Sequence, residues 1–122
     1  MKLTNSDTEK ECRADLIDSK KYLMESEKGQ HVLKHARKIC GDIKTIYALS
    51  HTPEQGEDIF RVLVNGERIF GFDLQDEAGQ FEAFNITTYS LKEYERLLTG
   101  KMGKLMLAIA LDLSKGDMQV DN

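Results

Sequence analysis

The sequence predicts an α+β domain, with two N-terminal helices, an antiparallel sheet of about four strands and a C-terminal helical segment packed on one sheet face. Three observations favour this class. Residues 30–40 repeat apolar side chains with helical spacing, residues 59–74 form two β-rich runs around Asn65-Gly66, and residues 90–93 read Ser-Leu-Lys-Glu, a helix-start motif. With 40% hydrophobic and 31% charged residues, we expect one domain over residues 1–122.

The first helix is expected over residues 5–28, where the apolar positions form only a narrow stripe. Asn5 or Ser6 can cap its N-terminus. Gly29 is expected to break the helical pattern, because glycine is a poor helix former. The second helix, over residues 30–40, has the stronger apolar face and is expected to pack more deeply.

Gly41 stands where a glycine commonly ends a helix. Residues 43–49 are rich in β-branched side chains and predict the first strand, and residues 50–53 read as a turn. The central hairpin follows, and residues 80–87 predict the fourth strand.

The Asn65-Gly66 turn permits two registers of the central hairpin. A two-residue turn pairs Val62 with Ile69 and puts large apolar side chains on both faces. A three-residue loop with a bulge pairs Phe60 with Phe70 and gathers the apolar side chains on one face. We expect the second register, because a one-residue slip exchanges the buried and exposed faces. The side chains on the shared face are Phe60, Val62, Phe70, Phe72 and Leu74.

The helix-start motif at residues 90–93 is a capping box, with Tyr89 and Tyr94 placed for a hydrophobic staple. Residues 104–114 are ambiguous, because leucine and isoleucine alternate as in a strand while most residue types favour a helix. We expect a helix there on propensity. Residues 116–122 are expected to be a frayed tail.

The net charge of −4 conceals an uneven distribution. Residues 53–82 hold eight carboxylates and two arginines, a local balance of −6. A hairpin closed at Asn65-Gly66 brings its outer ends together, so the acidic residues on either side should gather in wet loops at one end of the sheet. The candidate partner-binding residues are Glu54, Glu57, Asp58, Asp73, Asp76 and Glu77.

These six carboxylates admit several interpretations. Their spacing is not that of a calcium-binding loop, and an acid–base pair would need one carboxyl in an apolar pocket. A surface that recognises a basic protein needs only exposed groups of one sign, which would steer the partner during encounter. The plainer alternative is surface charge that keeps the protein soluble.

The second helix carries a basic face that could hold a metal or nucleic acid phosphates. The chain lacks the H-E-x-x-H pattern, a helix-turn-helix and interleaved aromatic residues, so we expect a solvated face, no metal, and no nucleic acid partner. The residues concerned are His31, Lys34, His35, Arg37 and Lys38.

No nucleophile elbow and no phosphate-binding glycine loop occurs in the sequence, so neither an enzyme nor a cofactor is predicted. Cys12 and Cys40 lack metal or redox spacing and are expected as free thiols. The first residues lack an export signal, and the longest apolar run, 105–111, is too short to cross a bilayer. We therefore expect a cytoplasmic protein with no membrane contact.

The function that the sequence favours is protein binding. In its concrete form, an inhibitor or immunity-type protein uses the acidic sheet end to cover a basic partner such as a nuclease toxin. One alternative is a small-ligand-binding or hydrolytic domain with a pocket between sheet and helices, and another is a nucleic-acid accessory protein using the second helix. A deep pocket with a buried carboxyl or histidine would favour the ligand or enzyme class, and a flat acidic surface the protein-binding class.

Overall fold

The computed structural model describes residues 2–54, 57–77 and 80–119, without the side chains of residues 53, 54, 57, 76, 77 and 84. The described elements confirm the predicted α+β class, with two N-terminal helices, an antiparallel sheet in the order β1-β2-β3-β4 and C-terminal helices. They are α1 (Asp7–Glu25), α2 (Glu27–Cys40), β1 (Ile46–Glu54), β2 (Glu57–Val64), β3 (Arg68–Glu77), β4 (Gln80–Ser90), α3 (Leu91–Leu97) and α4 (Lys101–Gln119).

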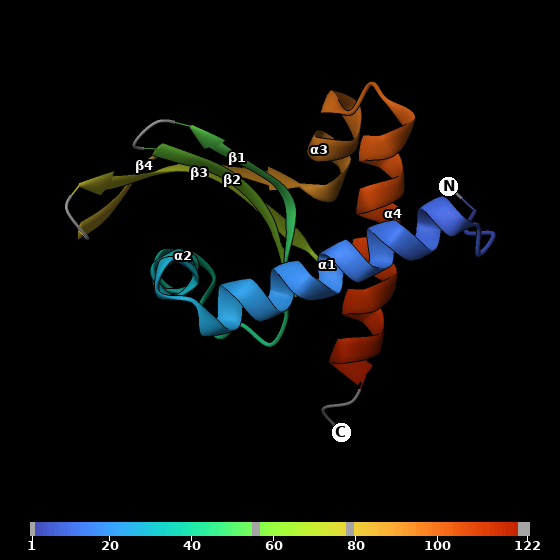
Figure 1. The fold of residues 1–122 in the computed structure, drawn as a ribbon, viewed down its shortest axis with the longest axis horizontal. Helices are drawn as coiled ribbons and strands as arrows, with labels where there is room; N and C mark the ends of the chain where they lie inside the picture. The colour runs from blue at the N-terminus through green and yellow to red at the C-terminus, as the bar shows by residue number, and fades with distance from the viewer. Residues whose placement is uncertain (1, 55–56, 78–79, 120–122) are drawn as a thin grey trace.

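The sheet is a curved meander, and α2 lies beneath its concave face (Figure 1). Helix α1 crosses the molecule beside β1, where the backbone N–H of Ala48 donates a hydrogen bond to Ser19 Oγ at 3.0 Å. Helices α3 and α4 stand at the end of the sheet opposite to the end of β1 (Figure 1). No helix in the described ranges is long and apolar enough to span a bilayer.

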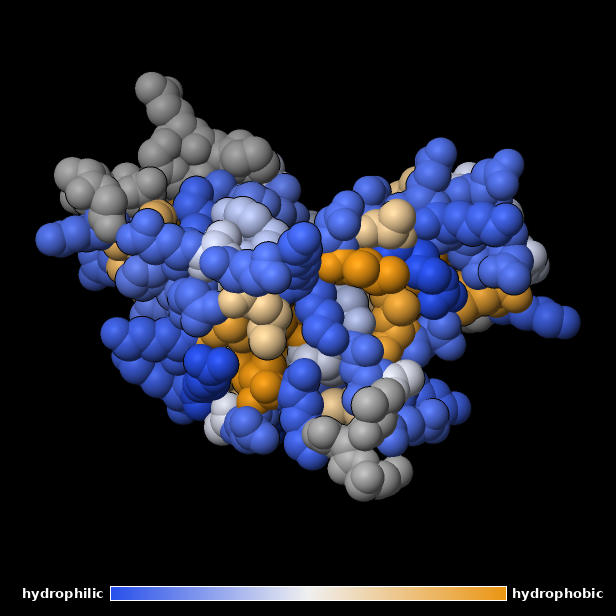
Figure 2. Space-filling view, turned by 60° about the horizontal axis from the view of Figure 1, so that its bottom comes forward, coloured by the Kyte–Doolittle hydropathy of each residue, from blue (hydrophilic) through white to orange (hydrophobic). Residues whose placement is uncertain are grey.

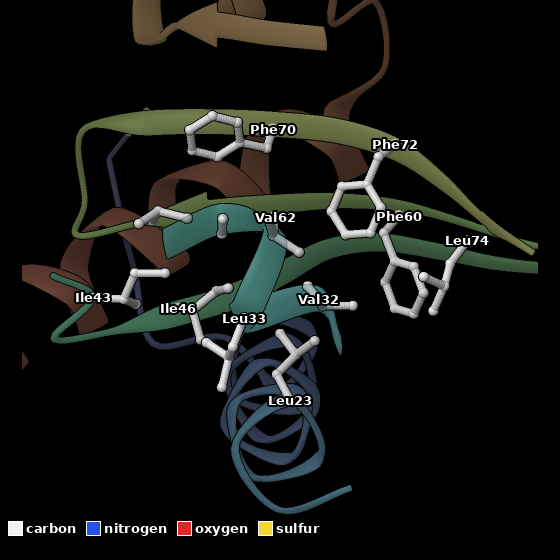
Figure 3. Close-up of a cluster of buried hydrophobic side chains, with 12 residues drawn as sticks. Leu23, Val32, Leu33, Ile43, Ile46, Phe60, Val62, Phe70, Phe72 and Leu74 are labelled. Carbon is white, nitrogen blue, oxygen red and sulfur yellow. The ribbon is translucent and has the colours of Figure 1, made fainter. Parts of the chain in front are cut away.

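The concave core joins the sheet to the end of α1 and to α2 (Figure 3). The predicted apolar face of the hairpin is confirmed, because Phe60, Val62, Phe70, Phe72 and Leu74 all lie buried in this core. The helices contribute Leu23, Val32, Leu33 and Ala36.

The hairpin loop has three residues, as expected, but the predicted pairing was shifted by two positions. Val64 lies opposite Arg68, and Phe60 lies opposite Phe72 rather than Phe70. A shift of two preserves the faces, which is why the predicted face was still correct. Gly66 has the positive φ expected of this turn, +67°.

Asn65 also has a left-handed backbone, with φ of 53°, and its side chain ties the hairpin to the start of β1. Its Oδ1 accepts from the backbone N–H groups of Lys44 at 2.8 Å and Thr45 at 3.2 Å, and its Nδ2 donates to the carbonyl of Asp42 at 2.9 Å. These bonds satisfy backbone groups that precede the strand.

The convex core covers the other sheet face at the end where α3 and α4 stand. Helix α1 contributes to both cores, with Leu23 in the concave one and Leu16 in the convex one, because it lies along the edge of the sheet. The buried members of the convex core are Cys12, Leu16, Tyr47, Leu49, Leu63, Ile69, Tyr94, Leu107, Ile109 and Ala110.

The break between the first two helices was predicted at Gly29 and lies at Ser26. Ser26 caps α2, and its Oγ accepts from the backbone N–H of Gly29 at 2.9 Å. Gly29 lies inside α2 for a packing reason, since a Cβ there would stand 2.4 Å from the carbonyl oxygen of Leu23. Of the two predicted caps for α1, Ser6 is the one used, and Gly41 ends α2 as expected with a φ of 81°.

Residues 50–53 were predicted as a turn and belong to β1, which begins at Ile46 rather than at residue 43. A register shift between Ala48 and Ser50 lets this edge strand continue. Strand β4 also runs beyond its predicted end at residue 87.

The C-terminal segment is helical, as propensity predicted over residues 104–114, and the helix is longer than expected. Residues 116–119 belong to α4 rather than to a frayed tail, and residues 120–122 lie outside the described part. The capping box is confirmed: Ser90 Oγ accepts from the backbone N–H of Glu93 at 3.2 Å, and Glu93 Oε1 accepts from that of Ser90 at 3.0 Å. The rings of Tyr89 and Tyr94 are in contact, with centroids 6.0 Å apart.

Candidate functional site

The register of the four strands brings acidic positions to one end of the sheet. Glu54 lies opposite Glu57, Glu57 lies opposite Gln75, and Gln75 lies opposite Glu82. This row, here called the acidic end, crosses three strand spacings, or about 14 Å. The acidic residues predicted to lie in loops therefore stand in regular strands. The side chains of Glu54, Glu57, Asp76 and Glu77 are outside the described part of the structure.

Asp58 lies one pair row from this row and Asp73 lies two pair rows from it, so their side chains point to opposite faces of the sheet. Asp73 pairs with Ile59 and is half-buried, and its Oδ2 accepts a hydrogen bond from Asn85 Nδ2 at 2.8 Å. Asn85 adopts a left-handed backbone, with φ of 55°, where the pairing of β3 with β4 shifts register. This irregularity in β4 sets an amide donor beside the carboxylate.

Asp58 faces the concave core and is only 6% exposed, so it does not belong to an exposed docking surface as predicted. Its carboxylate accepts hydrogen bonds from Lys28 Nζ and from His51 Nε2, the latter at 2.9 Å. Burial alone would raise the pKa of Asp58, but the hydrogen bonds and charges of Lys28 and His51 outweigh burial and lower it. Asp58 therefore serves folding.

His51 packs against the concave core beside Asp58. Its ring stacks on Phe60, with centroids 4.2 Å apart and planes at 10°, and Tyr22 lies on α1 at 6.1 Å from it. Phe60 in turn stacks on Phe72, at 5.6 Å. This column of rings fixes the strands of the acidic end to the helices beneath them.

The two arginines of residues 53–82 lie away from the acidic end. Arg61 pairs with Gly71 in the middle of the sheet, and Arg68 pairs with Val64 at the far end. The sheet therefore does not place an arginine in the row of Glu54, Glu57 and Glu82, and the negative charge of this segment is concentrated there.

Glu82 is the residue of the acidic end that the sequence argument missed. It is exposed on β4, and it joins the row only through the pairing of β4 with β3. The hairpin pattern in the sequence reaches only to β3, whereas the register of the fourth strand includes this residue.

The basic face predicted on the second helix is smaller in the structure. His31 contacts the ring of Phe81, with centroids 4.8 Å apart, instead of lying in solvent. Burial lowers the pKa of His35, and the nearby charges of Lys38 and Lys34 lower it further, so both favour the uncharged form of this imidazole. Lys34, Arg37 and Lys38 are exposed. The described residues contain no cluster of three or more side chains suited to a metal ion.

A cavity of about 640 Å³ lies between the N-terminal segment, α3 and α4, rather than between the sheet and the helices. Its described lining includes carboxylates and lysines but no histidine. Helices α3 and α4, which contribute to this lining, stand at the opposite end of the sheet from the acidic end (Figure 1). The chain matches no protein-family model, and neither the curated proteins nor the solved structures gave a significant match.

Proposed function

We propose that this domain binds another protein, and that the acidic end of the sheet docks on a basic surface of that partner. The observation that carries the proposal is the row formed by Glu54, Glu57, Gln75 and Glu82 across all four strands, in a segment with a balance of −6. Carboxylates of one sign gathered on a surface create a field that accelerates encounter with a cationic partner.

The contacts beneath this row favour a role of the acidic residues in partner recognition over a role in solubility alone. The strands are fixed from below by the Asp58 contacts with Lys28 and His51 and by the stacking of Phe60 on Phe72. Because the backbone that presents the acidic residues is ordered by these contacts, binding costs less conformational entropy than it would from a flexible loop.

The concrete form of the proposal is an inhibitor or immunity-type protein that covers the basic site of a nuclease toxin. Proteins that bind nucleic acid neutralise phosphates with lysine and arginine, and the same side chains donate hydrogen bonds to carboxylates. The proposal places the domain in the cytoplasm, where free thiols such as those of Cys12 and Cys40 are the rule.

The test compares two pairs of charge-neutralising variants with an oligolysine peptide as the probe. Asp73→Asn with Glu82→Gln removes one charge two pair rows from the acidic row and one charge within it, and Glu11→Gln with Asp15→Asn removes two exposed charges from α1. We expect the first pair to slow association about three- to tenfold at low salt and the second pair to leave the rate nearly unchanged.

Equal slowing by the two pairs would show that only the overall charge matters, and the proposed site would then be wrong. The proposal that the domain is an inhibitor has a separate test, the activity of a basic nuclease that copurifies with the chain. We expect the wild type and the α1 pair to inhibit this nuclease, and the Asp73→Asn, Glu82→Gln pair to inhibit it more weakly.

A further inference from the structure

The cavity between the N-terminal segment, α3 and α4 has the dimensions of a ligand site. Its volume of about 640 Å³ lies in the usual range for small-molecule pockets, about 300 to 1,000 Å³. The apolar part of its lining consists of Leu3, Leu98, Leu107, Ala108 and Leu111.

Helix α4 forms the longest wall of this cavity. Leu107, Ala108 and Leu111 share one face of the helix, and Lys104 and Lys115 lie on the same face before and after them. The two lysines are 11 positions apart in the sequence, which is about 16 Å along a helix. An apolar strip with a cation at each end therefore lines the cavity.

The opposite wall is an ordered hook at the N-terminus. Asn5 turns the chain with a left-handed φ of 62°, and the backbone N–H of Thr4 donates to Glu9 Oε2 at 2.7 Å. Glu9 is 3% exposed, and Leu3 packs against the convex core. These contacts hold Leu3 in place, so the cavity is bounded by fixed side chains on both sides.

The charges on the cavity rim favour an anion. Asp112 is paired with Arg13, with Nη1 and Oδ2 3.0 Å apart, which neutralises that carboxylate. Glu95 then stands alone against Lys104 and Lys115. The first turn of α4 contains no acidic residue, so the positive end of the helix dipole is not offset near Lys104. In a chain with a net charge of −4, this apolar cavity has a cationic rim.

We infer that the cavity binds a single-chain amphiphile with a carboxylate head group, such as a medium-chain fatty acid. The alkyl chain lies along Leu98, Leu107 and Leu111, and a rim lysine binds the carboxylate. Helices α3 and α4, which line the site, stand at the opposite end of the sheet from the acidic end (Figure 1), so the site is independent of the proposed protein-binding function.

The experiment titrates the full chain with decanoate and with decanol, both below their aggregation limits, by calorimetry. Lys104→Glu with Lys115→Glu reverses the rim charges, and Lys34→Glu with Lys38→Glu makes the same charge change at exposed positions of α2, outside the cavity lining. We expect the rim pair to weaken decanoate about tenfold or more and to leave decanol within about twofold. The control pair should change neither affinity by more than about twofold.

A second variant tests the cavity itself. Ala108→Trp would fill the space between α4 and the opposite wall, and we expect it to abolish binding of both ligands while circular dichroism shows an unchanged fold. Decanoate affinity that is equal in the rim and control pairs would overturn the inference, and so would binding that survives in a folded Ala108→Trp protein.

Discussion

The two ends of the sheet use acidic side chains in opposite ways. At the end where Ile46, Val64, Arg68 and Ser90 pair across the strands, here called the anchored end, Asp117 from α4 is held by several donors. Its Oδ2 accepts hydrogen bonds from Thr45 Oγ1 at 2.6 Å, from the Tyr47 hydroxyl and from Lys20 Nζ at 3.0 Å. At the acidic end, by contrast, Glu82 is exposed, and Asp73, which is half-buried as Asp117 is, accepts a hydrogen bond from Asn85 Nδ2.

The difference teaches that the set of donors around a carboxylate, rather than its burial, separates a structural carboxylate from a surface one. Burial would raise the pKa of Asp117, but the hydrogen bonds from Thr45, Tyr47 and Lys20 outweigh burial and lower it. Asp58 belongs with Asp117 by this criterion, although it lies near the acidic end, because Lys28 and His51 both contact it. The distance of a carboxylate from the acidic row therefore does not by itself decide whether that carboxylate is structural.

The largest effect is expected from reversing the charge at Asp58. In Asp58→Lys a second ammonium is buried beside Lys28, so we expect a loss of unfolding free energy of about 3 to 5 kcal/mol. The matched change at the exposed Glu82, Glu82→Lys, should alter it by no more than about 0.5 kcal/mol. Urea denaturation measures the change in unfolding free energy of both variants. Similar losses in the two would contradict the proposed distinction between the two carboxylates.

An intermediate effect is expected at the anchored end. Asp117→Ala leaves Thr45, Tyr47 and Lys20 without their common acceptor, and we expect a loss of about 2 kcal/mol. Asp112→Ala on the same helix breaks only the more exposed ion pair with Arg13 and should cost about 0 to 1 kcal/mol. A loss for Asp112→Ala as large as that for Asp117→Ala would contradict the anchoring role.

The smallest effect is expected on the free energy of unfolding at alkaline pH. Burial, together with the hydrogen bond to Asp117, raises the pKa of Tyr47 from 10.0 to about 12. Because the folded state favours the protonated phenol, its contribution is complete below about pH 10 and is lost as the pH rises towards 12. Tyrosinate absorbance should show an ionisation step near pH 12, and Tyr47→Phe should remove that late step. A late step that persists in Tyr47→Phe would contradict this placement.

Local patterns in the sequence were sufficient to predict the features that depend on a single helix, hairpin or turn. The alternation of apolar residues identified the buried face of the hairpin, Asn65-Gly66 identified the turn, and Ser90 with Glu93 identified a helix start. The other features of the fold depend on contacts between residues that are distant in the sequence. Gly29 resembles a helix breaker, and only the approach of Leu23 explains its place inside α2.

The candidate site was predicted less completely than the fold, for the same reason. The hairpin pattern predicted Glu54 and Glu57 at one end of the sheet, but the inclusion of Glu82 depends on the register of β4. Asp58 was assigned to the surface although it is two positions before Phe60, on the face that alternation buries. Its partner Lys28 is 30 residues away in the sequence.

The most direct test of the division between the two ends is a nuclear magnetic resonance titration of the ¹⁵N-labelled chain with an oligolysine peptide. The account predicts amide shift changes around Asp73, Gln75 and Glu82 that weaken as salt is added, and none around Thr45, Asn65 and Asp117. Shift changes that centre on the anchored end, or that spread evenly over the exposed acidic residues of the chain, would contradict it.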